Sequence, residues 1–553
     1  MKGYEYMAQM FKAYGVTHVF YMDAMLRMVQ AEMEKLGIES YLAHSENAAA
    51  YMADGYARAT GKPGIVCSQS IGSGNLAAGL YDAYLSNSPV IAFTGKKVPY
   101  LQYKNAYQEV EYQSMYESVT KFRAEIAHAN QLSHLLRQSF REVTTGKTKP
   151  AHLSVAGHLG RQIEEADIDE PICAERAYMK TPVYRPAAED NIVMEAVAAI
   201  KAAKKPIIVA GRGALISGAQ KEIYELASLN DIPIITTPDG KCVVDETDAL
   251  WAGCCGNYGM DCANVTLRCS DLVIFVGTQA SDQTTLDWTA PTKDTQVIQI
   301  DIDAAEIGRC YSNTIGLLGD AKTIVKQLVN ATEKARRLEW RNEVAGYVKR
   351  TLDEYKVFQE SGSTPIRPER LCHELSKVLP DNAVVVADTG YSAQWTTMML
   401  RLKTTHRYFR AGGSLGWSFP ASMGVKLGLP DNPVICFAGD GAMYYHIGEM
   451  ETMARKGIKT VTVVNNNQVL AQCAVDLKNV YAKVHGDANK AKHRYTFTPV
   501  LFSELAKSFG LNGVVVERPE DIGPAIVKAL AEDKSTVIDV MTYSDVTVPS
   551  PIR

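Results

Sequence analysis

The chain has 553 residues, of which 46% are apolar and 22% are charged, and this length predicts three domains rather than a single core. A net charge of −4 and an isoelectric point near 6.3 give no reason to expect a nucleic-acid partner. The sequence contains no apolar run of about 18 residues, so no membrane span is expected. The start of the chain lacks the apolar core of a secretory signal, and the eleven cysteines lie mostly in apolar segments without a CxxC pair, so we expect a cytoplasmic protein with reduced thiols and no zinc site.

Short runs rich in β-branched residues alternate with helical stretches, which indicates parallel strands covered by helices on both faces. The predicted strands lie at 16–20, 39–42, 64–67, 89–93, 152–155, 206–210, 232–236, 271–276, 296–301, 383–387, 434–438, 461–464, 514–516 and 537–540. Two segments are predicted to be linkers, 164–188 and the Gly/Ser/Pro break at 359–365. We therefore predict an α/β protein with three doubly wound parallel-sheet domains, over 1–165, 188–335 and 365–553. Such sheets bind ligands at the carboxyl ends of their strands.

Glu46 follows the predicted strand at 39–42 and begins a helix of small residues. The segment reads His44-Ser-Glu-Asn-Ala-Ala-Ala-Tyr-Met-Ala-Asp-Gly-Tyr-Ala-Arg58. A glutamate in a first helical turn has an ordinary explanation, compensation of the helix dipole, and this is the explanation that the position alone favours. His44 is open to two interpretations, a pocket acid/base or a solvated residue at a strand end.

Two motifs in the last third predict a clamp for a metal ion and a diphosphate. Gly439-Asp440-Gly441 follows one strand, and Asn466-Asn467 follows the next, with Asn467 27 positions after Asp440. Mg²⁺ takes about six oxygen ligands, usually with only one or two protein carboxylates beside phosphate oxygens. One Asp and one Asn at a shared sheet edge suit that demand. The glycines let the backbone approach phosphate, and the helix predicted from near Ala442 points N–H groups at it.

These segments resemble the thiamine diphosphate-dependent enzymes of the acetolactate synthase and benzoylformate decarboxylase group, in which a GDG motif is followed by NN and a conserved segment reads HE…AA.MA.GYAR. Further matching segments are 70–75, 105–109, 388–392 and 412–421. The resemblance covers nearly the whole chain. It implies that the first domain binds the cofactor's pyrimidine, that the third binds its diphosphate, and that a central domain lies between them.

The resemblance implies a role for each matching residue. Glu46 would bond a ring nitrogen of the aminopyrimidine and so favour loss of the C2 proton, and Gln108 and His44 complete the predicted catalytic set. Magnesium would be held by Asp440, Asn467 and the Val469 carbonyl. The residues implied in cofactor binding are Asn75, Gly390, Tyr391, Ser392, Gly413, Leu415, Asp440, Gly441, Ala442 and Asn467. Among them, Leu415 would hold the cofactor in a bent shape, and the Gly413 carbonyl would accept from its amino group.

The resemblance also has implications for the central domain and for the oligomeric state. Segments 210–213, 300–308 and 319–321 look like the nucleotide-site segments of that domain. Gln279 and Gln283 stand where acetolactate synthase has arginines that hold FAD, so FAD binding is doubtful and we predict a structural or vestigial central domain. Because the family forms its sites between subunits, a homodimer or homotetramer is implied.

The predicted activity is cleavage or ligation of a C–C bond beside the carbonyl of a 2-oxo acid or related small molecule, by way of an enamine, as a carboligase or decarboxylase. Alternatives within the class are a 1,2-diketone hydrolase and an acyl-CoA lyase. Alternatives outside it are a non-catalytic thiamine diphosphate-binding scaffold and a nicotinamide dehydrogenase, although no GxGxxG motif with a downstream acid is present.

Three segments are expected near the substrate pocket, and they bear on which substrate the protein takes. Tyr21-Met-Asp-Ala24 replaces the usual GxPG turn, so we expect altered specificity. Gln472 and Cys473 occupy positions that face the substrate in relatives. The tail at 546–553 is either a lid over the site or disordered.

Overall fold

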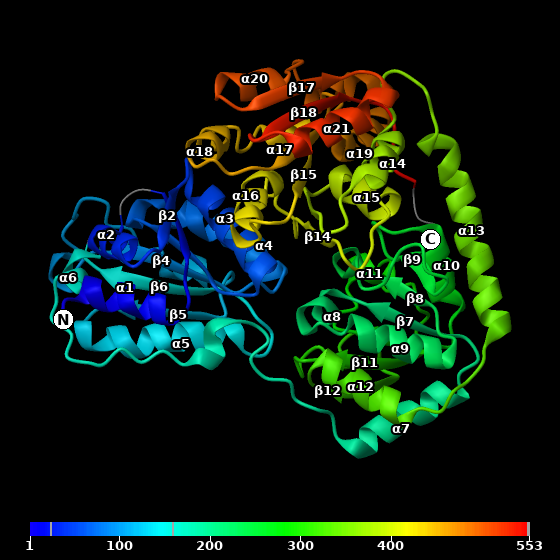
Figure 1. Cartoon of the computed structure of the whole chain (residues 1–553), viewed down its shortest axis with the longest axis horizontal. Coiled ribbons are helices and arrows are strands. Elements are labelled where there is room, and N and C mark those ends of the chain that lie inside the picture. The colour runs from blue at the N-terminus through cyan, green and yellow to red at the C-terminus, as the bar shows by residue number, and fades with distance from the viewer. Residues whose placement is uncertain (23–24, 158–159, 550–553) are drawn as a thin grey trace.

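The computed structural model describes residues 1–22, 25–157 and 160–549. Within these residues the chain forms three six-stranded sheets, and the strands pair in parallel in each of them. The sheets occupy successive thirds of the chain, as the colours of Figure 1 show. The predicted α/β fold of three parallel-sheet units is confirmed, whereas the predicted domain boundaries stay a prediction.

The first unit has the strand order β2-β1-β3-β4-β6-β5. Its strands are β1 (His18–Met22), β2 (Glu39–Leu42), β3 (Gly64–Ser68), β4 (Val90–Lys96), β5 (Phe122–Ile126) and β6 (Ala151–Ala156). Its helices are α1 (Gly3–Ala13), α2 (Arg27–Lys35), α3 (Glu46–Thr60), α4 (Ser73–Leu85), α5 (Leu132–Thr144) and α6 (Arg161–Glu164). Residues 23–24 of the Tyr21–Ala24 segment lie outside the described residues.

The middle unit has the strand order β12-β11-β10-β7-β8-β9. Its strands are β7 (Pro206–Ala210), β8 (Ile234–Thr236), β9 (Trp251–Cys254), β10 (Leu272–Val276), β11 (Gln296–Asp301) and β12 (Thr314–Leu318). Its helices are α7 (Asp190–Ala202), α8 (Arg212–Ser217), α9 (Gln220–Asn230), α10 (Asp261–Cys269), α11 (Asp282–Thr285) and α12 (Ala321–Ala331). The 22-residue helix α13 (Leu338–Gln359) then runs along this unit towards the third one (Figure 1).

The third unit has the strand order β14-β13-β15-β16-β18-β17. Its strands are β13 (Val384–Ala387), β14 (Arg407–Arg410), β15 (Val434–Gly439), β16 (Val461–Asn466), β17 (Asn512–Val516) and β18 (Thr536–Met541). Its helices are α14 (Pro368–Val378), α15 (Tyr391–Met399), α16 (Ser418–Gly428), α17 (Asp440–Met443), α18 (Glu449–Arg455), α19 (Ala471–His485), α20 (Phe502–Ser508) and α21 (Ile522–Ala531). None of the described helices combines the length and the apolar composition needed to cross a membrane.

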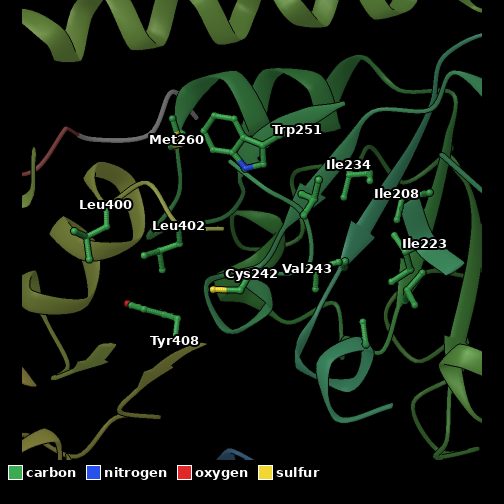
Figure 2. Packing of buried hydrophobic residues seen from close by; sticks show 14 of the residues in the cluster. Ile208, Ile223, Ile234, Cys242, Val243, Trp251, Met260, Leu400, Leu402 and Tyr408 are labelled. Carbon is green, nitrogen blue, oxygen red and sulfur yellow. The ribbon is translucent and has the colours of Figure 1, made fainter. Parts of the chain in front are cut away.

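The middle and third units share one apolar core. Figure 2 shows Trp251 and Cys242 of the middle unit beside Leu402 and Tyr408 of the third unit, and these residues belong to one buried cluster. The buried Lys241 crosses the same boundary, because its Nζ donates to Glu246 at 2.6 Å and to the carbonyls of Thr397 and Leu400 at 3.1 and 3.2 Å. Continuous apolar packing of this kind fixes the two units relative to each other.

The first and third units meet where α3 packs against α16. A Cβ on Gly55 would lie 2.1 Å from the carbonyl oxygen of Ala421, and a Cβ on Gly424 would lie 1.9 Å from that of Met52. Only glycine permits so close an approach of two backbones. This contact holds the helix that begins at Glu46 against the third unit.

The variant Gly424→Ala should unfold at a lower temperature, because the added methyl group would force α3 and α16 apart. Overpacking of this kind typically costs about 1–3 kcal/mol. Differential scanning calorimetry would measure the change. The matched control is Gly346→Ala in α13, where an added Cβ meets nothing within 4 Å, and where alanine should stabilise the helix by roughly 0.5–1 kcal/mol. Equal unfolding temperatures for Gly424→Ala and the unchanged protein would contradict the close packing.

Candidate active site

Asp440 and the turn at 467–469 lie together at the carboxyl edge of the third sheet. They follow β15 and β16, which are neighbouring strands with Gly439 paired to Asn465. The Asp440 side chain is only 3% exposed, and it accepts hydrogen bonds from the N–H of Gly441 at 2.6 Å and from the N–H of Gln468. The carboxylate is therefore oriented from two sides by backbone.

The two adjacent asparagines have different surroundings. Asn466 is buried, and its amide donates to Asp539 and to the Val500 carbonyl, both at 2.9 Å. Asn467 is less buried, and among the described residues its Oδ1 accepts only the Val469 N–H, at 3.3 Å. Asn466 therefore supports the fold, while Asn467 is the one available to a ligand. The Val469 carbonyl accepts the N–H of residue 471 at 3.0 Å and keeps a second lone pair.

This donor set fits a hard divalent cation. It offers one carboxylate, one amide oxygen and one backbone carbonyl, the oxygen ligands that Mg²⁺ prefers. Burial raises the pKa of Asp440 to about 7, although neighbouring backbone N–H groups act in the opposite direction. A bound cation would favour the ionised form. No group of three or more His, Cys, Asp or Glu side chains suited to a metal occurs in the described part of the chain.

The start of α15 supplies backbone donors near this edge. Gly390 has a φ of 65°, and no side chain caps the helix that begins at Tyr391, so its first N–H groups are available to phosphate. Ser392 lies close to the clamp, since a Cβ on Gly439 would be 3.4 Å from its Oγ. The Tyr391 hydroxyl instead bonds the backbone of Val548, so only its backbone N–H is placed for such a role.

The loop that carries Gly413 and Leu415 is held by two buried aspartates. Asp82 of α4 accepts the N–H groups of residues 412, 413 and 414 at 2.6, 3.2 and 2.8 Å. Asp388 accepts those of residues 416 and 418 at 3.0 and 2.9 Å. Within the described residues the Gly413 carbonyl accepts no hydrogen bond, and Leu415 packs on the apolar cluster that contains Ala442. The loop is thus rigid, with one carbonyl still available.

Asp82 belongs to a buried ion-pair network that sequence reasoning missed. Arg58 of α3 donates to Asp54 at 2.8 Å and to Asp82 at 3.0 Å, and Trp417 donates to Asp54 at 2.9 Å. The guanidinium also donates to the carbonyl of residue 410 at 2.8 Å. The network ties α3 and α4 of the first unit to the 412–418 loop. The only sign of this network in the sequence is that Asp54, Arg58 and Asp82 stand inside helical segments that are otherwise mostly apolar.

Glu46 is positioned by a second cluster, at the carboxyl edge of the first sheet. Ser45 caps α3 by accepting the Ala48 N–H, so Glu46 is the first helical residue. Its Oε2 accepts from the Asn75 amide at 2.7 Å. A Cβ on Gly72 would lie 2.3 Å from Oε1, so glycine leaves the room that this carboxylate occupies.

Gln108 lies on the loop beside that cluster. Its backbone has a φ of 59°, and its carbonyl accepts from Ser70 at 3.1 Å. The side-chain oxygen is buried and has no hydrogen-bond partner among the described residues, which is costly unless a ligand supplies a donor. His44, by contrast, pairs through Nε2 with Glu451 of α18 at 2.8 Å and is half exposed, and its N–H donates to Glu449 at 2.8 Å.

Within one chain the two clusters are linked only indirectly, because α3 and α4, which carry Glu46 and Asn75, are tied to the 412–418 loop by the ion-pair network. Over the described residues, no hydrogen bond or ion pair joins Glu46, Asn75 or Gln108 to the residues around Asp440, Gly390 and Gly413. Large apolar side chains are exposed near the first cluster, with Ile71 54% and Tyr107 76% accessible.

A cavity of about 310 Å³ lies at the carboxyl ends of the middle sheet. Its wall includes Gly213, Gly277 and Asp301, and also Gln279 and Gln283. The glutamines thus occupy the wall of this cavity without supplying the positive charge that arginines would give to a diphosphate. The absence of FAD stays a prediction.

Three domain models of thiamine pyrophosphate enzymes match the chain in order. The N-terminal TPP binding domain matches 1–115, the central domain 193–328, and the C-terminal TPP binding domain 388–540. The clusters around Glu46 and Asp440 fall in the first and the last of these.

Relatives with similar sequences match over almost the full length. A "Probable acetolactate synthase large subunit" of Methanococcus aeolicus is 30% identical over 521 residues, which cover 90% of this chain and 84% of the relative. The protein of that name in Methanocaldococcus jannaschii is 28% identical over 98% of this chain and 92% of its own. The "Acetolactate synthase large subunit" of Lactococcus lactis is 26% identical over the same shares. The chain therefore belongs to the acetolactate synthase family of thiamine diphosphate-dependent enzymes.

Proposed function

We propose that the protein uses thiamine diphosphate and Mg²⁺ to cleave or form a C–C bond beside the carbonyl of a 2-oxo acid, as a carboligase or decarboxylase like acetolactate synthase. The observation that carries the proposal is the pair of clusters, with Glu46 oriented by Asn75 at one sheet edge and Asp440 oriented beside Asn467 at another. They provide separate groups for the two ends of one cofactor. When bound, the cofactor supplies the electron sink for the C–C bond cleavage.

Each cluster has a defined task in this proposal. Glu46 would hold its carboxylate against the pyrimidine ring of the cofactor, in a site that a second subunit shields from water. It would thereby promote removal of the weakly acidic C2 proton of the cofactor. Asp440, Asn467 and the Val469 carbonyl hold the metal ion. The Gly413 carbonyl orients the amino group of the pyrimidine, and Leu415 provides the apolar wall beside it.

The active enzyme is proposed to be a homodimer or homotetramer with each site between two subunits. One observation supports this arrangement. The apolar side chains exposed beside Glu46, such as Ile71 and Tyr107, would be covered by a partner. We also propose a cytoplasmic location.

A substrate panel tests the activity. The protein loaded with thiamine diphosphate and Mg²⁺ should release CO₂ from pyruvate or another 2-oxo acid and join the remaining fragment to a second carbonyl compound. Product analysis by NMR, with and without each cofactor, measures this. Cleavage of 1,2-diketones without CO₂, or turnover of acyl-CoA substrates only, would contradict the proposal and identify the alternative activity. Cofactor binding without any turnover across the panel would favour a scaffold instead.

A further inference from the structure

A cavity of about 720 Å³ lies where the three units meet. Its wall includes Thr17 and Pro89, which precede β1 and β4, so it lies at the amino ends of these strands. Glu46 follows β2 at the opposite, carboxyl edge of the same sheet. The cavity is therefore separate from the candidate active site, and its volume is typical of a small-molecule site.

The wall of this cavity is strongly basic. None of the described residues that line it is Asp or Glu, and its cationic members are Arg58, Lys62, Lys180, Arg212, Lys241 and Arg407. Two of them are neutralised from behind the wall, Arg58 by Asp54 and Asp82, and Lys241 by Glu246. The other four form no ion pair within the described residues.

One of the four has an ordinary structural explanation. Arg407 donates to the carbonyl of Ala59 at 2.7 Å, in the last turn of α3, and cations stabilise the carboxyl ends of helices. Arg212 has no such explanation, because it is the first residue of α8, where the helix dipole is positive. Its Nε is buried, and no described residue offers it a hydrogen bond. Burial is the largest cause that lowers the pKa of Arg212, which falls to about 10, and the positive charge of the nearby Arg58 is the second.

Lys62 and Lys180 come to the same edge of the cavity from distant segments. The N–H of Thr181 donates to the carbonyl of Gly61 at 2.9 Å, which fixes the linker onto the turn after α3. A Cβ on Gly61 would lie 3.3 Å from Lys180 Cε, so this lysine extends along the turn that leads into Lys62. The arrangement gathers like charges, which is unfavourable unless an anion binds between them.

The carboxylates near these groups lie outside the cavity wall. Asp239 lines the smaller cavity, not this one, and pairs with Arg410 at 2.6 Å. Asp239 and Asp54 attract the Arg212 guanidinium from a distance without forming an ion pair. Glu39 accepts from the Tyr41 hydroxyl at 2.5 Å. Within the described residues, one guanidinium and two ammonium groups therefore line the cavity without an ion-pair partner, which suits an anion with several charged oxygens.

We propose that this cavity binds an anion that carries two or more phosphate groups, held by Arg212, Lys62 and Lys180. The volume accommodates a chain of phosphates with or without an attached nucleoside. The guanidinium and the two ammonium groups in the wall of the cavity can donate to tetrahedral phosphate oxygens spread along such a chain. The site goes beyond the proposed activity and does not depend on it.

Calorimetric titration of tripolyphosphate tests the proposal. The protein is first saturated with thiamine diphosphate, and Mg²⁺ is kept in excess, so that the cofactor site and the metal are not limiting. We expect one bound tripolyphosphate per chain, with affinity at least tenfold weaker in the double variant Lys62→Gln/Lys180→Gln and in Arg212→Gln. The matched control is Lys326→Gln, an exposed lysine on α12 that lines neither cavity. Parallel titrations with ATP and citrate distinguish a nucleotide, a bare phosphate chain and a polycarboxylate.

Several results would overturn the proposal. These are no binding at millimolar tripolyphosphate, equal binding by the double variant, or citrate binding as tightly as tripolyphosphate. Arg212 lines both cavities, so weaker binding in Arg212→Gln alone would assign the anion to the smaller cavity and also refute the site. Retention of thiamine diphosphate and an unchanged unfolding temperature show that each variant is folded.

Discussion

The Glu46→Gln variant should retain thiamine diphosphate and Mg²⁺ but exchange the C2 proton of the bound cofactor roughly 10²- to 10⁴-fold more slowly. Glutamine keeps the size of the side chain and can still accept from Asn75, so the geometry of the cluster survives. It lacks the negative charge that favours the basic tautomer of the pyrimidine. NMR of quenched samples in D₂O measures the exchange, and cofactor content is measured on the same samples.

Two comparisons separate the charge of Glu46 from its position. Asn75→Ala removes the 2.7 Å hydrogen bond to Oε2 and should slow the exchange less than Glu46→Gln, because the carboxylate remains. Glu504→Gln is the control, since that carboxylate is exposed on α20 and pairs with Lys507. Exchange at the normal rate in Glu46→Gln would refute the assigned role.

The fold could be predicted from the sequence where strands are buried on both faces. Interior strands such as β10 and β15 are continuous apolar runs and were predicted. The strands that were missed are β5, β9, β12 and β14, and each lies at the edge of its sheet. Each of the four contains charged residues or glycine, as in Arg407-Tyr-Phe-Arg410 and Trp251-Ala-Gly-Cys254, so none of them is the β-branched apolar run that identifies a buried strand.

The candidate site could be predicted from the sequence only in part. The rule that ligands meet at the carboxyl ends of parallel strands was enough to bring Asp440 and the 467–469 turn together. It could not distinguish the structural Asn466 from Asn467, because that depends on Asp539, which is 73 positions from Asn466. Nor could it show that Asp82 orients the 412–414 backbone, since this contact spans 330 or more positions. Long-range polar contacts of this kind leave no local pattern.

The Asp440→Asn variant should lose its cofactor, with thiamine diphosphate bound roughly 100-fold more weakly or worse in the presence of Mg²⁺. The exchange keeps the shape of the side chain but removes the only carboxylate in the predicted metal set, and Mg²⁺ depends on carboxylate and phosphate oxygens. Calorimetric titration of thiamine diphosphate into the cofactor-free protein, at fixed Mg²⁺, measures the loss. Circular dichroism of the same samples shows whether the third unit is folded.

The matched control lies at the other end of the same strand. Asp431 precedes β15, is exposed and is remote from the edge where Asp440 follows the strand, so Asp431→Asn should bind the cofactor normally. Because Glu46 and Asp440 lie in different clusters, their variants should fail in different ways. Glu46→Gln keeps the cofactor and loses proton exchange, whereas Asp440→Asn loses the cofactor itself. An Asp440→Asn protein that purifies with a full complement of thiamine diphosphate and Mg²⁺ would show that the metal is held elsewhere, and the clamp would have to be abandoned.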